Sequence, residues 1–477
     1  PDNGSCSTID ASCDRIRLYA RPTTVIASGR ASAATQVLTL HMDDGVDLAA
    51  TLYEPAAAPP PAGYPAIVLF HGLGGKRQDL AAVAQRFTDP FAVLAFDQRG
   101  HGESGGLVSI DGPREIADAR AVVQQLAARP EIDGAKIGAW GISLGGGAVL
   151  RSLVEGVPWA AVEVVETWTD LYSALAPQNL AKSGAIFQFL SSVPADRLDP
   201  SVAAIREDAL ASRNLPALRA WADARSSRRL LSKVRTPVFF FQGRRDFAFD
   251  IAQAKAGYAL VRGPKRLYVG DFGHAPSTFP GPDFTQVTKL GLAWFTRYLA
   301  GASTTTIAPV TLAPSPFRRT VRTYGKLPAT RRLSLALPGT DRLAGAGRAL
   351  RASGRFTGRA ETFGSAVVRV MARLTGGWPR LVAVLTAQPR RGPEVVVSEG
   401  GVNTTGLSGT RQLAIRLIDT ATLIPRGARL RLTLASSSLA QSPGNLLYLN
   451  LPVPPAARIT LGAASLTLPI LRKPVSR

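Results

Sequence analysis

A serine among glycines, in residues 136–150 (KIGAWGISLGGGAVL), has the surroundings expected of a catalytic nucleophile. Ser143 lies in the pattern Gly-x-Ser-x-Gly, after an apolar run typical of a strand and before a run typical of a helix. Glycine costs stability in both elements, so several together indicate a sharp bend or close backbone packing. Such a bend lifts a serine hydroxyl out of the sheet. We therefore predict that Ser143 attacks a carbonyl group, the alternative being a structural serine.

A serine hydroxyl needs a base to take its proton, and the chain offers 4 histidines. His41 lies in a predicted hairpin, and His71 and His101 lie in glycine-rich loops with patterns of their own. His274, in YVGDFGHAPS, follows a late strand, as the chain order Ser, acid, His requires. His274 is the predicted base, and a surface histidine is the alternative.

The orienting carboxylate is expected after the apolar run PVFFFQG, which Asp246 and Asp250 both follow. Asp246 comes first and is favoured as the partner of the imidazole N–H, whereas Asp250 fits the start of a helix. An oxyanion also needs two backbone donors. We predict the N–H of Leu144, directly after the nucleophile, and that of Leu73 in the loop HGLGG.

Other chemistries find less support in the residue patterns. The segment GLGG lacks the Lys and the Ser or Thr of a phosphate-binding loop. No spacing of Cys, His and Asp indicates a metal site. We therefore expect neither a cofactor nor a metal ion.

The surrounding elements predict two different folds in succession. In residues 36–300, short apolar strands alternate with helical patterns, which predicts a mostly parallel sheet covered on both faces, that is, an α/β protein. A helix-like insertion at about 169–235 predicts a cap. In residues 305–477, strand-like runs separated by turns predict an antiparallel β-sandwich or jelly roll. Residues 1–35 are expected to form an N-terminal extension.

The two cysteines, Cys6 and Cys13, lie close together near the start of the chain. We expect them to form a small disulfide loop, which favours an exported protein, although two unrelated thiols are the alternative. No apolar run reaches the length of a membrane-spanning helix. The chain is therefore expected to be secreted or held at the cell surface, with its signal peptide removed.

The charge is unevenly distributed along the chain. Residues 301–477 hold 25 Lys and Arg but only 5 Asp and Glu, so nearly all of the net charge of +22 lies there. No nucleic-acid-binding motif accompanies these residues, so no nucleic-acid partner is expected. A solvated basic face is the simplest interpretation, with electrostatic association with anionic surfaces as a further hypothesis.

Taken with the predicted triad, the segments FHGLGG, FDQRGHGES, GISLGGG and GRRD make residues 36–300 similar to an α/β-hydrolase. Residues 396–438 resemble the C-terminal jelly roll of the X-prolyl dipeptidyl peptidase and cocaine esterase family. The resemblance implies a hydrolase domain with a helical cap, followed by a jelly roll packed near the site. It also implies serine-dependent cleavage of an ester or amide.

The chain departs from this family at two points. Members often place a tyrosine hydroxyl in the oxyanion hole, whereas Leu73 stands in HGLGG, as in lipases and esterases. Peptidase members also need a carboxylate for the substrate amine. Glu163, Glu166, Asp170 and Glu207 are candidates, and each is more simply interpreted as an ordinary helix-surface acid.

Trp168 is a further candidate residue of the site. It is expected at the end of the strand that follows the predicted helix after Ser143, beside the predicted active-site crevice. It resembles a tryptophan of cutinase-like polyester hydrolases that stacks on the acyl group. A tryptophan of the hydrophobic core is the alternative.

The sequence thus predicts a serine hydrolase that cleaves carboxylic esters through an acyl-enzyme, polymeric esters included. The first alternative is an X-Pro dipeptidyl peptidase or acyl-amide hydrolase. The second is a non-catalytic, wall-associated binding protein that uses the basic C-terminal domain.

Overall fold

The computed structural model describes residues 34–302, 305–438 and 447–472. The predicted pair Cys6 and Cys13 lies outside these residues, so its disulfide stays a prediction. None of the described helices is long and apolar enough to cross a membrane.

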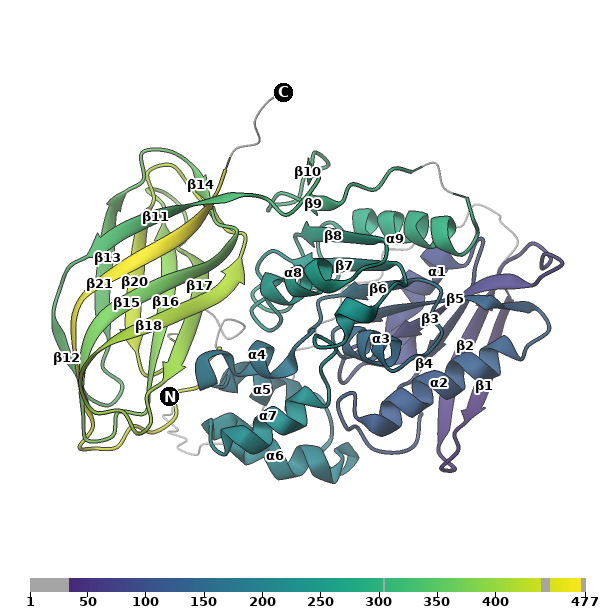
Figure 1. Ribbon diagram of the computed structural model, residues 1–477, viewed down its shortest axis with the longest axis horizontal. Helices are drawn as coiled ribbons and strands as arrows, with labels where there is room; N and C mark the ends of the chain where they lie inside the picture. Colours follow the sequence, from purple (N-terminus) through teal and green to yellow (C-terminus); the bar gives the residue numbers. More distant parts are fainter. Residues whose placement is uncertain (1–33, 303–304, 439–446, 473–477) are drawn as a thin grey trace, which may run out of the picture. The chain divides into compact units, whose positions relative to one another are not determined.

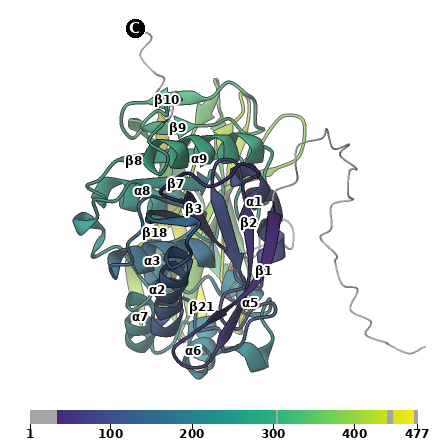
Figure 2. The same cartoon turned by 90° about the vertical axis from the view of Figure 1, so that its right-hand side faces the viewer.

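Ten strands form one large mixed sheet, parallel from β4 to β9 (Figure 1). Its central strands are apolar on both faces, as a parallel sheet covered by helices requires. The hairpin of β1 and β2 forms one edge (Figure 2). In sheet order, the strands are β1 (Ala34–His41), β2 (Asp47–Glu54), β4 (Ala92–Phe96), β3 (Tyr64–Phe70), β5 (Ile132–Ile142), β6 (Val162–Val165), β7 (Val238–Gly243), β8 (Lys265–Gly270), β9 (Val310–Leu312) and β10 (Arg322–Tyr324).

Helices cover both faces of this sheet, which confirms the predicted α/β-hydrolase architecture (Figures 1 and 2). Alternate side chains of each strand enter two separate hydrophobic cores, one on each face. The first core is completed by α2 (Pro113–Ala127), α3 (Leu144–Val154) and α8 (Ile251–Leu260), and the second by α1 (Ala81–Phe87) and α9 (Phe284–Tyr298).

The chain between β6 and β7 forms a group of four helices instead of a simple crossover. They are α4 (Leu171–Leu175), α5 (Ser183–Leu190), α6 (Pro200–Ala211) and α7 (Leu215–Asp223). Asp170 and Asp199 cap the N-termini of α4 and α6 by accepting backbone N–H groups. The apolar faces of the four helices share a cluster with Leu144 and Trp168. This group, the cap, therefore covers the N-terminal end of α3.

The C-terminal strands are all antiparallel and form a region of their own. Along β15 buried residues alternate with exposed ones, as one solvated face requires. One sheet contains β11 (Thr330–Leu337), β21 (Arg458–Leu471), β15 (Gly364–Thr375) and β18 (Gly409–Thr420), with β12 (Asp341–Leu343) paired to β21. The other contains β13 (Ala349–Arg355), β20 (Arg429–Ala435), β16 (Arg380–Gln388) and β17 (Val395–Asn403), and β14 (Ala360–Glu361) pairs with β19 (Leu423–Ile424).

The predicted start of the C-terminal domain, residue 305, differs from the observed topology. β9 pairs in parallel with β8, and β10 pairs with β9, so both strands extend the first sheet. The pairing is long-range and leaves no mark on the local pattern. The all-β character of the following region is confirmed, whereas its description as a jelly roll stays a prediction.

The loop after β7, residues 244–250, is held by the C-terminal strands. The side chain of Arg244 pairs with Glu361 and donates to the carbonyl of Ala421. Arg245 donates to the carbonyl of Val396 at 3.0 Å. The backbone N–H of Asp419 donates to the Asp250 carboxylate at 2.8 Å. The loop that follows β7 is thus fixed by contacts to residues more than a hundred positions later.

Two buried ionisable groups lie where the cap, this loop and β17 meet. Lys182 donates from Nζ to the carbonyls of Phe247 and Ala248, at 2.9 and 2.8 Å. Glu399 accepts a hydrogen bond from the Ser438 hydroxyl at 2.8 Å. Burial raises the pKa of Glu399 to about 8, although the Ser438 hydrogen bond and Lys182 oppose the shift.

Replacement of Glu399 by Gln is expected to change the pH dependence of stability. Between about pH 4.5 and 8 the folded protein keeps a proton on Glu399 that the unfolded chain loses, so wild-type stability falls as pH rises through this window. Glu399→Gln removes that loss and should gain stability relative to wild type by up to a few kcal/mol from pH 5 to pH 8. Thermal unfolding of both proteins at pH 5, 6.5 and 8 measures the difference. Glu207→Gln, at an exposed position, is the control, and a difference independent of pH would contradict the expectation.

Candidate active site

Ser143 stands at a strained turn between β5 and α3. Its backbone has φ 53° and ψ −116°, a conformation that a residue with a side chain rarely adopts. Two hydrogen bonds hold it: the Ser143 N–H donates to the carbonyl of Val165 at 2.9 Å, and the Thr167 hydroxyl donates to the Ser143 carbonyl at 2.7 Å. The neighbouring strand β6 therefore maintains the turn that presents the hydroxyl.

The surrounding glycines let three backbone segments approach one another. A Cβ on Gly145 would lie 2.3 Å from the carbonyl oxygen of Phe70, and one on Gly141 would lie 2.2 Å from the carbonyl oxygen of Gly145. A Cβ on Gly147 would collide with Asp111 and with the ring of Trp168. Side chains at these positions would push α3 away from β3 and from the cap.

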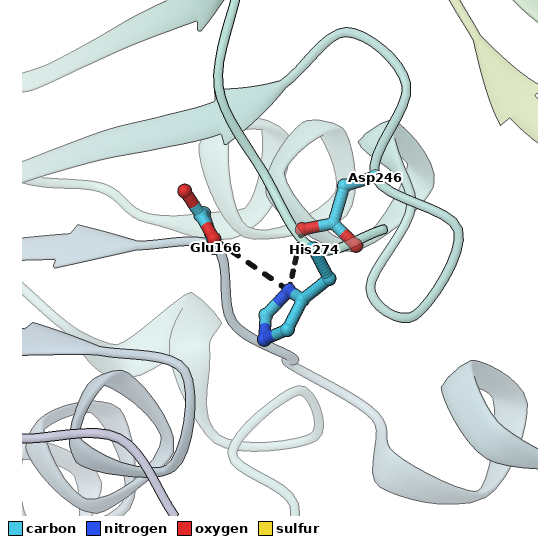
Figure 3. A group of neighbouring side chains, drawn as sticks. All are labelled: Glu166, Asp246 and His274. Atoms are coloured by element: carbon cyan, nitrogen blue, oxygen red, sulfur yellow. Dashed lines mark hydrogen bonds and ion pairs between the residues drawn. The ribbon is translucent and has the colours of Figure 1, made fainter. Parts of the chain in front are cut away.

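The structure brings Ser143, His274 and Asp246 together in one hydrogen-bonded chain. Ser143 Oγ lies 2.9 Å from His274 Nε2. His274 Nδ1 lies 2.8 Å from Asp246 Oδ2, a contact drawn in Figure 3. The Asp246 side chain is 0 % exposed, and its other oxygen accepts the backbone N–H groups of Ala248 and Phe249. This geometry allows the imidazole to take a proton from the serine while the carboxylate holds the other ring nitrogen.

Asp250, the alternative acid, lies elsewhere. It caps α8 by accepting the N–H of Ala252 and also accepts the N–H of Asp419. Burial, with a contribution from the nearby Asp419, raises its pKa to about 6. Its expected place at a helix start agrees with the structure, but it is buried against the C-terminal strands instead of solvated.

Leu73 and Leu144 both flank Ser143 at the wall of one pocket. Leu144 is the first residue of α3, so its N–H has no acceptor within the helix and remains available to an oxyanion. Leu73 follows Gly72, on which an added Cβ would lie 3.6 Å from that of Ser143. The geometry is compatible with both predicted donors, whose role remains a prediction.

His71 orders the loop that carries Leu73, a role that the sequence did not indicate. Its carbonyl accepts the N–H of Gly145 at 3.0 Å, and its Nε2 accepts the N–H of Gln98 at 2.9 Å. Burial lowers the pKa of His71 to about 3, so the ring is neutral and can accept this bond. The loop is thereby tied to the elbow itself.

A mostly apolar pocket leads to Ser143 and encloses about 780 Å³ of empty space, open solvent at its mouth included. The cap helices α4 to α7 supply most of its walls. The lining side chains are Leu73, Ile110, Ser143, Leu144, Trp168, Leu171, Tyr172, Leu175, Ala176, Ile186, Phe189, Leu190, Val202, Ile205, Arg206, Ala209, Leu218, Trp221, Ala222 and Phe249.

Trp168 belongs both to this wall and to the hydrophobic core. Its side chain is 2 % exposed, its ring lies 5.0 Å from that of Phe249, and its indole N–H donates to the carbonyl of Arg225 at 2.9 Å. The indole is thus fixed by its surroundings. Its contact with an acyl group stays a prediction.

Glu166 is buried beside the triad, contrary to its interpretation as a surface acid. Its Oε2 lies 3.6 Å from His274 Nδ1 (Figure 3), and its Oε1 is buried without a hydrogen-bond partner among the described residues. Burial, together with the charges of Asp246 and Asp283, holds its pKa well above the usual range. These surroundings therefore favour the neutral, protonated form of Glu166.

The other suggested amine-binding acids also lie outside the pocket wall. Glu163 is fully buried and accepts the indole N–H of Trp140, so its interpretation as a surface acid was wrong as well. Asp170 caps α4, and Glu207 is exposed. Glu166, Asp246 and His274 are close enough together to hold a metal ion, but both ring nitrogens of His274 are already engaged in the hydrogen-bonded chain.

Comparison with known proteins agrees with this architecture. A family model described as X-Pro dipeptidyl-peptidase (S15 family) matches residues 44–276. A CocE/NonD family hydrolase from Staphylococcus aureus has a similar structure, with a TM-score of 0.70 at 14% identity over 93% of this chain and 97% of its own. The chain thus has the α/β-hydrolase fold and is similar to the X-prolyl dipeptidyl peptidase and cocaine esterase family.

Two further proteins place this α/β-hydrolase among related folds. An α-amino acid ester hydrolase is similar in structure, with a TM-score of 0.68 at 14% identity over 94% of this chain and 98% of its own. The quorum-quenching protein AidA of Acinetobacter baumannii (strain MDR-ZJ06) is 34% identical over 138 residues, 28% of this chain. That match spans only 44% of AidA, less than half its length. The family match and the fold support a serine hydrolase acting on an ester or peptide bond.

Replacing each of the two carboxylates near His274 by its amide is expected to identify the orienting acid. Asp246→Asn should lower kcat/KM by about 10³- to 10⁴-fold, because the amide no longer favours the required tautomer of His274. Glu166→Gln should change kcat/KM by less than about threefold, because the amide has the shape of the neutral acid that burial favours. Steady-state hydrolysis of one chromogenic ester by both variants measures this. A large loss in Glu166→Gln with a small one in Asp246→Asn would assign the role to Glu166.

Proposed function

We propose that this α/β-hydrolase cleaves carboxylic esters, with Ser143 as nucleophile, His274 as base and then acid, and Asp246 as the orienting carboxylate. The observation that carries the proposal is the hydrogen-bonded chain from Ser143 Oγ through His274 to the buried Asp246. The strained elbow and the apolar pocket that opens on Ser143 provide further support.

The reaction proceeds in two halves that share one proton carrier. His274 Nε2 takes the proton of Ser143 as Oγ attacks the ester carbonyl, and the N–H groups of Leu73 and Leu144 stabilise the oxyanion. His274 then gives the proton to the departing alkoxide, which leaves as the alcohol. In the second half, His274 takes a proton from a water molecule, which attacks the acyl-enzyme. His274 then returns this proton to Ser143 Oγ as the acid product leaves.

The pocket wall favours an ester over a substrate with a free amine. Its described lining residues include no Asp or Glu, so no carboxylate there could pair with the ammonium of a dipeptide or an amino acid ester. The apolar side chains from the cap suit an acyl chain without charge near the scissile bond. We therefore favour an ester over the X-Pro dipeptides of the family name.

We extend this proposal to polymeric esters as substrates and to an extracellular location. The support for a polyester is the wall position of Trp168, and a soluble oligoester is the first substrate to try after simple esters. The support for secretion is the Cys6 and Cys13 pair and the distribution of charge in the sequence.

Removal of the nucleophile is expected to abolish ester turnover. Wild type should hydrolyse p-nitrophenyl butyrate and leave an X-Pro p-nitroanilide intact, and Ser143→Ala should lower kcat/KM for the ester by about 10³-fold or more. Release of p-nitrophenol and p-nitroaniline measures both reactions in one format. Anilide cleavage that depends on Ser143 would move the assignment to peptidases, and ester turnover unchanged in Ser143→Ala would place the chemistry elsewhere.

A further inference from the structure

A single charged side chain interrupts the apolar wall of the pocket. On α6, Val202, Ile205 and Ala209 line the pocket, and Arg206 lines it with them. These positions recur at the spacing of one helix face, so Arg206 occupies a place where the pattern calls for an apolar residue. Of the described lining residues it alone carries a charge.

Arg206 has no partner in the part of the chain that the structure describes. Its Nε is buried without a hydrogen bond, although the side chain as a whole is only partly buried. The acidic residues near it in sequence are engaged or turned away, since Asp208 pairs with Arg213 and Glu207 is exposed. A guanidinium is always protonated, so the pocket wall holds an unpaired positive charge.

A second unpaired donor lies on the neighbouring helix. Trp221, on α7, lines the same pocket, and its indole N–H is buried without an acceptor among the described residues. The guanidinium of Arg225 stacks on the ring of Trp221, 3.9 Å from the ring centroid. Since α6 and α7 pack against each other, both free donors belong to one region of the cap.

Buried donors without acceptors are rare in folded proteins because each has lost its hydrogen bonds to water. Two of them in a pocket that is otherwise lined mostly by apolar side chains indicate that the acceptor comes from the ligand. An oxyanion suits both groups, and a planar carboxylate is the anion whose geometry a guanidinium matches best.

We propose that Arg206, assisted by the indole N–H of Trp221, binds a carboxylate at the end of the acyl group remote from the scissile carbonyl. The favoured substrate is then the half-ester of a dicarboxylic acid, which water converts to the free diacid and an alcohol. This inference rests on the proposed ester hydrolysis at Ser143 and specifies its substrate class.

Two pairs of esters that differ only in the remote group test this. The pairs are monoethyl hexanedioate with ethyl hexanoate, and monoethyl octanedioate with ethyl octanoate, each followed by ethanol release. The quantity compared is the ratio of kcat/KM for the half-ester to that for the neutral ester. In Arg206→Gln this ratio should fall about tenfold or more, because a charge-assisted hydrogen bond is lost.

Three further variants separate this role from general effects of charge or folding. Arg206→Lys keeps the charge and should restore part of the ratio, and Trp221→Phe keeps the ring but should lower the ratio several-fold. Arg235→Gln removes an exposed charge at the end of the cap segment, outside the pocket wall, and should leave the ratio within about twofold of wild type. Hydrolysis of ethyl hexanoate shows that each variant is folded.

The outcomes distinguish this inference from the function on which it rests. A ratio that is unchanged in Arg206→Gln, while ethyl hexanoate is still hydrolysed, overturns the role of Arg206 and leaves the esterase intact. A ratio that falls equally in Arg235→Gln also overturns it, because long-range attraction would then suffice. Wild type that hydrolyses none of the four esters overturns both proposals.

Discussion

The hydrogen bond between His274 and Asp246 is the interaction on which the rest of the site depends. It joins two loops that leave neighbouring strands, β7 and β8, and it decides which ring nitrogen of His274 faces Ser143. Asp246 can hold this position because its second oxygen accepts two backbone N–H groups of its own loop. That loop in turn makes hydrogen bonds and ion pairs with the C-terminal strands. The antiparallel region therefore supports Asp246 without contributing a side chain to the hydrogen-bonded chain of Ser143, His274 and Asp246.

The cap also packs against the C-terminal strands and the loop after β7. Leu180 and Ala185 of the cap, Phe247 of the acid loop and Val382 and Ile418 of the C-terminal strands share one hydrophobic cluster. Hydrogen bonds accompany it, from the Gln178 amide to the carbonyl of Gly401 and from the Gly184 N–H to the carbonyl of Leu447. The buried Lys182 bridges cap and loop. Since the cap also forms the pocket wall, substrate binding and the position of Asp246 rest on one packed assembly.

The fold and the central residues of the site could be predicted because their signals are local. The Gly-x-Ser-x-Gly turn and the apolar strand runs lie within short windows, and the chain order of serine, acid and histidine can be read directly, so Ser143, His274 and Asp246 could be proposed from the sequence. The structure places these three side chains in hydrogen-bond contact, and their catalytic roles stay a prediction. The parts that could not be predicted depend on pairings between distant segments. The place of β9 in the first sheet, the burial of Glu166 and the pocket-facing position of Arg206 are set by tertiary packing. A charged residue carries no mark in the sequence that tells a buried position from a solvated one.

Glu166 shows how the site keeps a single negative charge beside its base. A second ionised carboxylate next to Asp246 would place two like charges in one buried site, which is unfavourable. Burial raises the pKa of Glu166, and the charges of Asp246 and Asp283 raise it further, so these surroundings favour its neutral form. The left-handed backbone of Glu166, with φ 50°, fixes the side chain at the end of β6. His274 thus has one hydrogen-bonded carboxylate partner, Asp246, whose Oδ2 lies 2.8 Å from Nδ1, whereas Glu166 Oε2 lies 3.6 Å from the same nitrogen.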